Sequence, residues 1–221
     1  MNKIALPQAE HWNHYWGLDQ EQFKKISWSK RRIIETLQPF IKSGNNALDA
    51  GCGSGFFSGY FISQGMNTTS LDYSTQALEI TRQMTQSKAN IIQKDLLNDP
   101  LSQYIDQRFD LIFTDGLFEH FTEPQQDKIF NNLCSVLSDR GVLATFVPNK
   151  WSPWELIRPF YMPGIEEDPF TLSQLVRLNE RNGLTVLCKG GLNTFPFRFS
   201  PDQWLGPAFG MLLFTLAQKN G

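Results

Sequence analysis

The sequence lacks the features that would tie it to a membrane, a disulfide framework or a cysteine-bound metal. Its cysteines, Cys52, Cys134 and Cys188, are odd in number, far apart and without metal-site spacing. This usage fits a reducing compartment, and no apolar signal core lies near the N-terminus, so we expect a cytoplasmic protein. The longest apolar run, residues 211–217, is too short to cross a bilayer.

Charge of one sign is also missing. The 221 residues carry 20 Lys and Arg against 22 Asp and Glu, a net charge of −2. No strong field therefore attracts nucleic acid. A basic cluster near the start is interpreted as a solvated helix face: Lys24, Lys25, Lys30, Arg31 and Arg32. A hydrophobic content of 41% is enough for a proper core, and the length predicts one domain, residues 1–221.

What is present begins with residues 47–55, a short apolar run followed by glycine at every second position. Residues 56–62 then resemble the start of a helix. A strand, a glycine turn and a helix form a cradle, because glycine adopts positive φ and the helix start offers free N–H groups. A dinucleotide fingerprint needs a sixth-position glycine, where this chain has Phe56. Asp49 just before the turn favours a ligand with an ammonium group over a phosphate.

The spacing of apolar residues predicts alternating strands and helices along the first two thirds of the chain. The first helix is expected within residues 19–41, with Asp19 as its N-cap; Ser74 caps a later one. Further strands are expected at residues 68–72, 89–94, 109–114 and 142–147. This alternation predicts a doubly wound, mostly parallel α/β sheet with helices on both faces, of the Rossmann-like type.

The last third differs because two stretches rich in proline and aromatic residues interrupt it, at 148–170 and 195–210. We expect both to be loops, separated by a helix over 171–182 and a strand over 184–188. A final strand is expected over 211–217. Residues 1–44 would form a helical cover, 45–147 the ligand-binding core, and 148–221 the substrate-side loops and last two strands.

Acidic residues stand where the predicted parallel strands end, which is where doubly wound sheets bind ligands: Asp49, Asp72, Asp95 and Asp115. Asp72 follows the glycine turn by about 20 residues, a spacing at which a carboxylate accepts from ribose hydroxyls. Asp95 and the N–H of Leu96 are placed to recognise adenine, and Tyr73 to lie against it. Any one of these acids alone could equally be a helix-capping loop carboxylate.

Together, residues 48–55, 71–74, 94–96 and 109–113 resemble the successive cofactor motifs of class I S-adenosylmethionine-dependent methyltransferases. The likeness covers residues 45–147. It implies a seven-stranded sheet with the last strand antiparallel, S-adenosyl-L-methionine as cofactor, and Gly51 and Gly53 against its methionine part. Cys52 would lie in the cofactor turn without a chemical role.

Residues 119–121 resemble the segment after strand four in small-molecule methyltransferases related to those of ubiquinone biosynthesis. His120, beside Glu119, is then a candidate base, or else a histidine that binds backbone at a helix start. Some members carry Glu-x-x-Glu-His and bind a divalent metal. Here Gly116 replaces the first acid, so we expect no metal. An N-terminal segment resembles one that folds over the cofactor in related enzymes: His14, Tyr15 and Trp16. The alternative is that these residues form a hydrophobic staple for the first helix.

We therefore expect a methyltransferase acting on a hydroxyl or amine of a small, apolar or aromatic acceptor. The late aromatic residues could line its pocket, cover the sheet or form a homodimer interface: Trp151, Trp154, Phe160, Tyr161, Phe195, Phe197, Phe199 and Trp204. Arg158 and Arg198 could pair with an acidic acceptor. An RNA or protein methyltransferase and a non-catalytic cofactor-binding module are the alternatives; RNA would require the early basic residues to form one patch.

Overall fold

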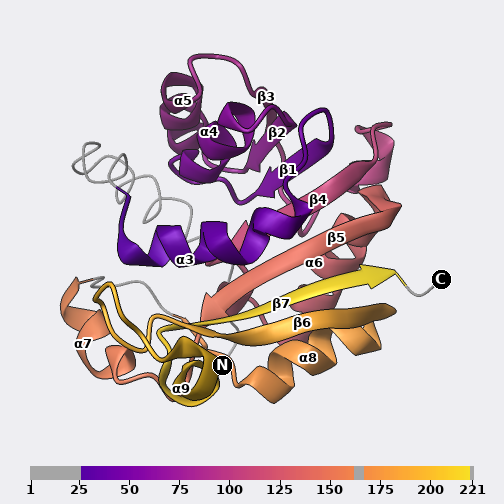
Figure 1. The fold of residues 1–221 in the computed structure, drawn as a ribbon. Coiled ribbons are helices and arrows are strands. Elements are labelled where there is room, and N and C mark those ends of the chain that lie inside the picture. The colour runs from indigo at the N-terminus through magenta and orange to yellow at the C-terminus, as the bar shows by residue number, and fades with distance from the viewer. Residues whose placement is uncertain (1–25, 162–166, 220–221) are drawn as a thin grey trace.

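The computed structural model describes residues 26–161 and 167–219 of the chain. They form one seven-stranded sheet with helices against both faces (Figure 1). The strands are β1 (Asn46–Ala50), β2 (Asn67–Asp72), β3 (Asn90–Gln93), β4 (Phe109–Asp115), β5 (Leu137–Pro148), β6 (Leu184–Leu192) and β7 (Leu212–Lys219). The helices are α3 (Trp28–Leu37), α4 (Phe56–Ser63), α5 (Thr75–Met84), α6 (Glu123–Val136), α7 (Trp154–Tyr161), α8 (Leu172–Arg181) and α9 (Asp202–Phe209).

The strand order across the sheet is β3-β2-β1-β4-β5-β7-β6. The first five strands of this order are parallel, whereas β7 runs antiparallel to both β5 and β6. This confirms the expected Rossmann-like sheet with an antiparallel last strand. The order reverses between β1 and β4, so the loops after these strands diverge and leave room for a ligand.

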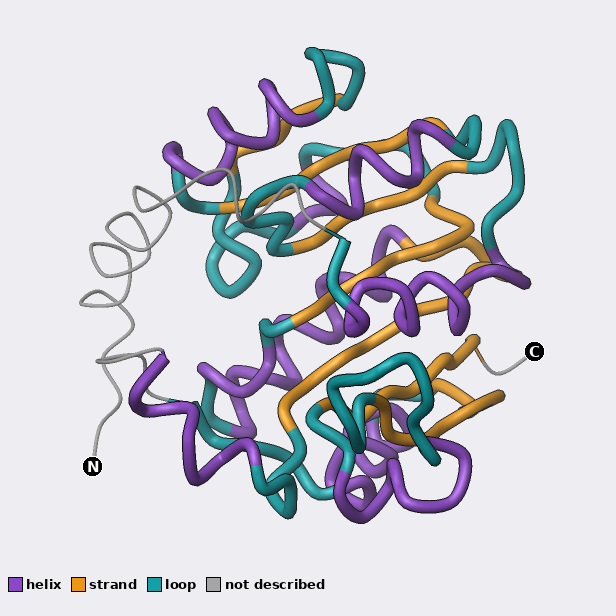
Figure 2. Tube along the Cα trace, turned by 60° about the vertical axis from the view of Figure 1, so that its left-hand side comes forward, coloured by secondary structure: helices purple, strands orange, loops and turns teal. Residues whose placement is uncertain are grey.

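The period-two alternation of the strands divides the core between the two sheet faces. On one face, Leu48 and Leu143 pack with apolar residues of α6 and α8. On the other, Ala47 and Ala144 pack with residues of α3 and α4. Figure 2 shows helices on both sides of the strands.

Part of the large phenylalanine content forms a row of rings on the second face. Phe57 of α4, Phe113 of β4, Phe146 of β5 and Phe214 of β7 lie with successive centroids 4.5, 5.6 and 5.8 Å apart. Such pairs stabilise beyond the apolar area they bury. The row joins the central strands to the antiparallel strand, so it holds the two halves of the sheet together.

Helices α4, α5 and α8 begin where the sequence predicts, whereas α3 begins at Trp28 with Ser27 as its N-cap and ends at Leu37, inside the predicted range 19–41. Ser74 caps α5 by accepting from the N–H of Ala77, as expected. Two helices were missed, because α7 and α9 lie within the stretches predicted as loops. Both helices contain a proline past the first turn, Pro159 and Pro207, where proline removes a helical hydrogen bond, so the proline-rich stretches favoured the prediction of loops. No helix in the described ranges is long and apolar enough to cross a membrane.

Arg32 corrects the interpretation of the early basic cluster as a solvated face. Its side chain is buried on α3, where it donates to Asn193 Oδ1 at 2.5 Å and to the carbonyl oxygens of Phe195 and Phe197. It also pairs with Asp202 at 3.2 Å. Arg32 therefore fastens the loop between β6 and α9 to the first described helix.

We predict that Gly206→Ala lowers the free energy of unfolding by about 1–3 kcal/mol. A Cβ on Gly206 would overlap the backbone of Gly191, so α9 could not keep its distance from β6. Gly59→Ala is the matched control. Gly59 lies within α4, and a Cβ there would meet Cγ of Met84, the last residue of α5, at an ordinary 3.8 Å. It should stabilise by up to about 1 kcal/mol. Chemical denaturation measures both, and equal effects would contradict this packing account.

Candidate functional site

A cavity of about 500 Å³ opens at the carboxyl ends of the parallel strands. Every described residue that the sequence marks as a site residue lies on its wall: Asp49, Gly51, Cys52, Gly53, Asp72, Tyr73, Asp95, Leu96, Asp115, Glu119 and His120. They come from the C-terminal ends of β1, β2 and β4 and from the loops after β1 to β4, because parallel strands end at the same edge of the sheet. His14, Tyr15, Trp16 and Asp19 lie outside the described residues.

The glycine turn has the positive φ angles that its sequence predicts. Gly51, Gly53 and Gly55 have φ values of 76°, 50° and 70°, in the region that favours glycine. The N–H groups of Gly51 and Cys52 both donate to the carbonyl oxygen of Leu71, at 2.8 and 3.0 Å. The turn after β1 is thereby fixed to the end of β2. Gly51, Cys52 and Gly53 of this turn line the cavity.

Asp49 is buried beneath this turn. Its Oδ2 accepts from the N–H of Ser58 at 2.9 Å and from the Ser58 hydroxyl at 2.6 Å, and Ser70 donates to that hydroxyl at 2.7 Å. Burial raises the pKa of Asp49 to about 7, against the opposing hydrogen bonds from Ser58. A cationic group in the cavity would favour the ionised form.

Asp72 joins two loops through its carboxylate. Oδ2 accepts from the N–H of Gly53 at 3.0 Å, and Oδ1 accepts from the N–H of Ser74 at 2.9 Å. Burial raises the pKa of Asp72, whereas these backbone hydrogen bonds lower it. Tyr73 follows, 40% exposed on the cavity wall, with a ring face large enough to cover an aromatic base.

Asp95 has a second task that the sequence left open. Its carboxylate accepts from the N–H of Leu97 at 2.8 Å and from the Asn98 amide at 2.6 Å, so it organises its own loop. Leu96 is buried, and its carbonyl oxygen accepts from Asn132 at 2.8 Å. Loop order and a place on the cavity wall therefore coincide in Asp95.

Asp115 and Lys30 bring opposite charges into the cavity. Burial raises the pKa of Asp115 to about 7, which Lys30 partly offsets. Burial lowers the pKa of Lys30 to about 8, which Asp115 opposes. The ammonium group of Lys30 lies 3.9 Å from the centre of the Phe56 ring, a cation–π distance. Lys30 thus belongs to the cavity and not to a solvated face.

Glu119 and His120 lie at another part of the wall, on the short helical turn Phe118–His120 after β4. The Gln126 amide holds this turn by donating to the carbonyl oxygens of Phe118 and Phe121, at 3.1 and 2.9 Å. Both side chains are buried. Burial, followed by the negative charge of Glu167, raises the pKa of Glu119 well above its ordinary value.

Sequence reasoning missed Lys30 and Glu167 as cavity residues. Lys30 stands three residues before Ile33 and seven before Leu37, both buried, so the helical period does place it on the inner face. Glu167 carries no comparable signal, because it stands in an irregular stretch that only the fold brings to Glu119.

The late aromatic residues divide into two groups. Trp154 lines the cavity. Five others are exposed on the surface: Trp151, Phe195, Phe197, Phe199 and Trp204. The side chains of Phe160 and Tyr161 lie outside the described residues. Of the three alternatives, lining of the pocket holds for Trp154 and does not hold for the exposed five in this cavity; a cover for the sheet and a homodimer interface stay predictions for those five.

Comparison with known proteins agrees with this geometry. The family described as "Methyltransferase domain" matches residues 41–182 of the 221. The chain belongs to this family. The match runs from the residues before β1 to the end of α8, and so includes the glycine turn and the acids of the cavity. The resemblance to class I methyltransferases is confirmed, with S-adenosylmethionine as the cofactor.

Two curated relatives of this methyltransferase are similar over part of their length. A malonyl-[acyl-carrier protein] O-methyltransferase of Pectobacterium atrosepticum is 40% identical over 82 residues, 37% of this chain and 32% of the relative. A malonyl-[acyl-carrier protein] O-methyltransferase 1 of Ilyobacter polytropus is 26% identical over 146 residues, 64% of this chain and 53% of the relative. The matched part thus spans about a third to a half of these relatives.

A solved structure has the same fold over the whole chain. A SAM-dependent methyltransferase from Anabaena variabilis superposes with a TM-score of 0.69 at 19% identity, covering 100% of this chain and 98% of its own. At that identity the likeness concerns the fold.

We predict that the cofactor-free methyltransferase loses stability as pH rises from about 4 to 7. Asp49 titrates at 3.8 when unperturbed and at about 7 when folded, so the folded state binds more protons in this window. Asp49→Asn should flatten the dependence, by about 1.4 kcal/mol for each unit of pKa difference removed. The Asn amide oxygen can still accept from Ser58. Denaturation midpoints across this window measure it; an unchanged slope in the variant would contradict it.

Proposed function

We propose that this methyltransferase transfers the methyl group of S-adenosylmethionine to a hydroxyl or amine of a small, apolar or aromatic acceptor. One observation carries the proposal: a single cavity joins the acids at the strand ends to a wall rich in aromatic and aliphatic side chains. The first part suits the cofactor, the second a mostly apolar acceptor. A sulfonium already carries a good leaving group, so catalysis consists largely of alignment.

For the cofactor, the preorganised acids support specific assignments. Asp72, already oriented by two backbone N–H groups, would accept from the ribose hydroxyls. Asp95, Leu96 and Tyr73 would surround the adenine, and Asp115 and Asp49 would lie near the methionine ammonium. These roles of Asp72 and Asp95 follow the family pattern.

Lys30 adds a cation for the methionine carboxylate, because it stands near Asp115 and is half-buried on the cavity wall. Gly51, Cys52 and Gly53 would pack against the methionine part, where their low bulk leaves room.

For the acceptor, Glu119 and His120 are the candidate groups, and Glu167 lies beside them. Phe121, Trp154 and Leu212 line the same cavity and would hold an apolar or aromatic molecule. Tyr15 and Trp16, with the segment around them, remain proposed as a cover over the bound cofactor.

The substrate that names the two relatives, malonyl-[acyl-carrier protein], is less well suited to this chain. A carboxylate acceptor needs a cation, and Arg158 on the cavity wall already pairs with Glu155 at 3.1 Å and Glu167 at 3.4 Å. The net negative charge around it favours a neutral or cationic acceptor. Without a bound cation at this wall, these charges favour an acceptor outside the malonyl class.

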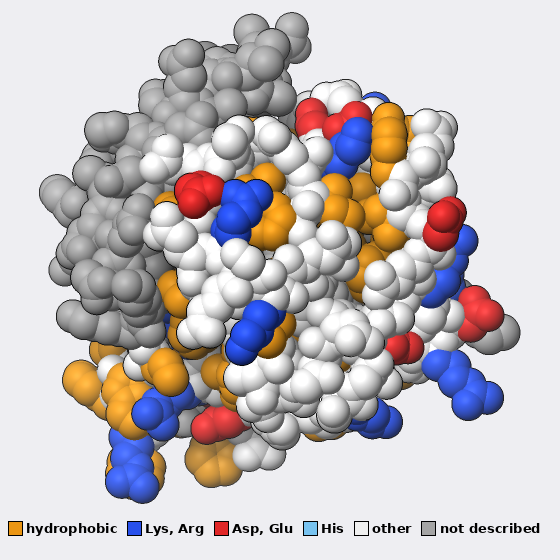
Figure 3. Space-filling model, turned by 90° about the horizontal axis from the view of Figure 1, so that it is seen from above, with side chains coloured by type: hydrophobic (Ala, Val, Ile, Leu, Met, Phe, Trp, Pro, Cys, Tyr) orange, Lys and Arg blue, Asp and Glu red, His pale blue; other side chains and the backbone are white. Residues whose placement is uncertain are grey.

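The charge pattern of the described surface gives an RNA acceptor no support. Among the described basic residues of the early cluster, Lys30 enters the cavity, Arg32 is buried and Arg31 is exposed. On the face of the molecule that Figure 3 shows, Lys and Arg side chains are spread out and alternate with acidic ones. RNA recognition would require a continuous basic surface.

We predict that calorimetric titration detects S-adenosylmethionine binding and that Asp72→Ala weakens it at least about a hundredfold, since two charged hydrogen bonds are lost. NAD serves as the ligand control and should not bind. Glu79→Ala is the variant control: it removes an exposed acid of α5 that pairs with Arg82. It should leave the affinity unchanged.

Folded wild type that binds neither cofactor would overturn the proposal. Binding of S-adenosylmethionine without turnover of any hydroxyl or amine acceptor would favour the non-catalytic module. An equal loss in Asp72→Ala and Glu79→Ala would contradict the assignment of Asp72.

A further inference from the structure

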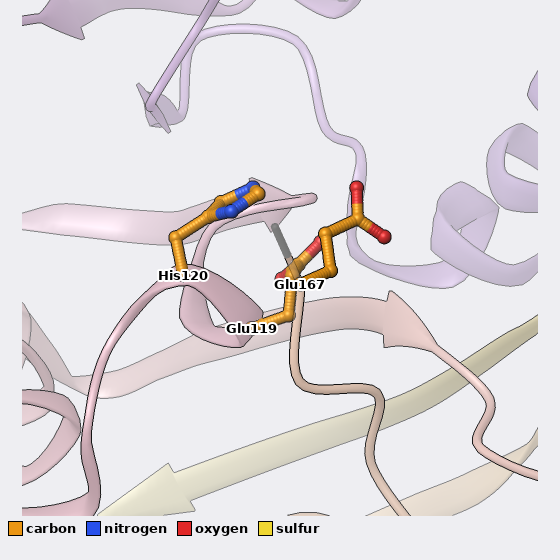
Figure 4. A group of neighbouring side chains, drawn as sticks. All are labelled: Glu119, His120 and Glu167. Carbon is orange, nitrogen blue, oxygen red and sulfur yellow. The ribbon is translucent and has the colours of Figure 1, made fainter. Parts of the chain in front are cut away.

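Three potential metal ligands meet on the cavity wall, two of them adjacent in the sequence and the third far from both. Glu119 and His120 come from the turn after β4, and Glu167 comes from the segment before α8. One ligand atom from each lies within 4.8 Å of the others. Figure 4 shows the carboxylates of Glu119 and Glu167 close together, with the His120 ring beside them.

Glu119 is the most deeply buried member of the group. Its side chain is 1% exposed, and its Oε2 atom is buried without a hydrogen-bond partner. A buried carboxylate oxygen in this state is costly unless a ligand or a proton satisfies it. The backbone supports the position: the N–H of Asp168 donates to the Glu119 carbonyl oxygen at 2.9 Å, which fixes the Glu167 segment to this turn.

The surrounding charges leave an excess of negative charge. Glu155 and Glu167 share the guanidinium of Arg158, at 3.1 and 3.4 Å. Glu119 adds a third carboxylate to this partly buried group, and Asp115 acts on it from the end of β4. One guanidinium cannot neutralise them all. A doubly charged cation beside Glu119 would.

We propose that Glu119, His120 and Glu167 bind a divalent cation of the Mn²⁺, Fe²⁺ or Zn²⁺ class. Imidazole with two carboxylates is a donor set that suits these ions. Bonds of about 2.0–2.2 Å require the ligand atoms, which lie within 4.8 Å of one another, to approach to about 3.0–3.5 Å when the ion binds. Three protein ligands leave positions open toward the cavity, as in catalytic sites. The acid missing at Gly116 is thus replaced by one that the sequence places 48 residues after Glu119.

The role of this cation rests on the proposed function. An acceptor hydroxyl bound at an open position would lose its proton to solvent more easily, because a divalent cation lowers the pKa of a bound oxygen acid. The resulting oxyanion forms the new bond to the methyl carbon while the sulfur–methyl bond breaks, and the sulfonium becomes a neutral thioether. His120 then acts as a ligand and Glu119 stays ionised.

Mn²⁺ titration of the cofactor-free protein, followed by the loss of the free-ion signal in electron paramagnetic resonance, tests the site directly. Wild type should bind one Mn²⁺ per chain. Glu119→Gln and Glu167→Gln should each weaken binding at least about tenfold. Glu155→Gln is the matched control, since it removes the same charge from the same cluster without removing a ligand, and should stay within a few-fold of wild type.

Absence of saturable Mn²⁺ binding in folded wild type would overturn the site, as would an equal loss in Glu155→Gln and Glu119→Gln. Titration with S-adenosylhomocysteine on the same samples separates the two proposals. Cofactor binding without Mn²⁺ binding would leave the proposed function and remove the metal site. Mn²⁺ binding without cofactor binding would do the reverse.

Discussion

The site depends first on the carboxylate of Asp72. It accepts from the N–H of Gly53 in the turn after β1 and from the N–H of Ser74 at the start of α5, so one side chain sets two loops. The carbonyl oxygen of Leu71 adds two further hydrogen bonds to the same turn. With these contacts the cofactor end of the cavity exists before any ligand arrives, and binding need not organise it.

This preorganisation brings several carboxylates together in a partly buried site, which disfavours their ionised forms. Asp49 and Asp72 are buried and Asp115 is half-buried near them, and burial raises the pKa values of all three. A cofactor with a sulfonium and an ammonium group is the complementary ligand. The same reasoning extends to Glu119, because its Oε2 atom is buried without a hydrogen-bond partner and a cation beside it would be favourable. The cavity is a set of carboxylates prepared for positive partners.

Much of this could be predicted from the sequence because it rests on local patterns. Glycine at alternate positions between an apolar strand and a helix predicts the turn, and an acid after each parallel strand predicts the cavity wall. Glu167 could not be found this way, since its place beside Glu119 arises from the path of β5 and the segment before α8. The helices α7 and α9 were missed because proline was interpreted as a break, although tertiary packing tolerates it there.

A crystal structure with bound S-adenosylhomocysteine tests the central claim most directly. We expect the ribose hydroxyls on the two oxygens of Asp72, the adenine beside Leu96 and Tyr73, and the sulfur facing the part of the cavity that holds Glu119 and His120. A nucleoside bound elsewhere, or a ribose without contact to Asp72, would contradict the account.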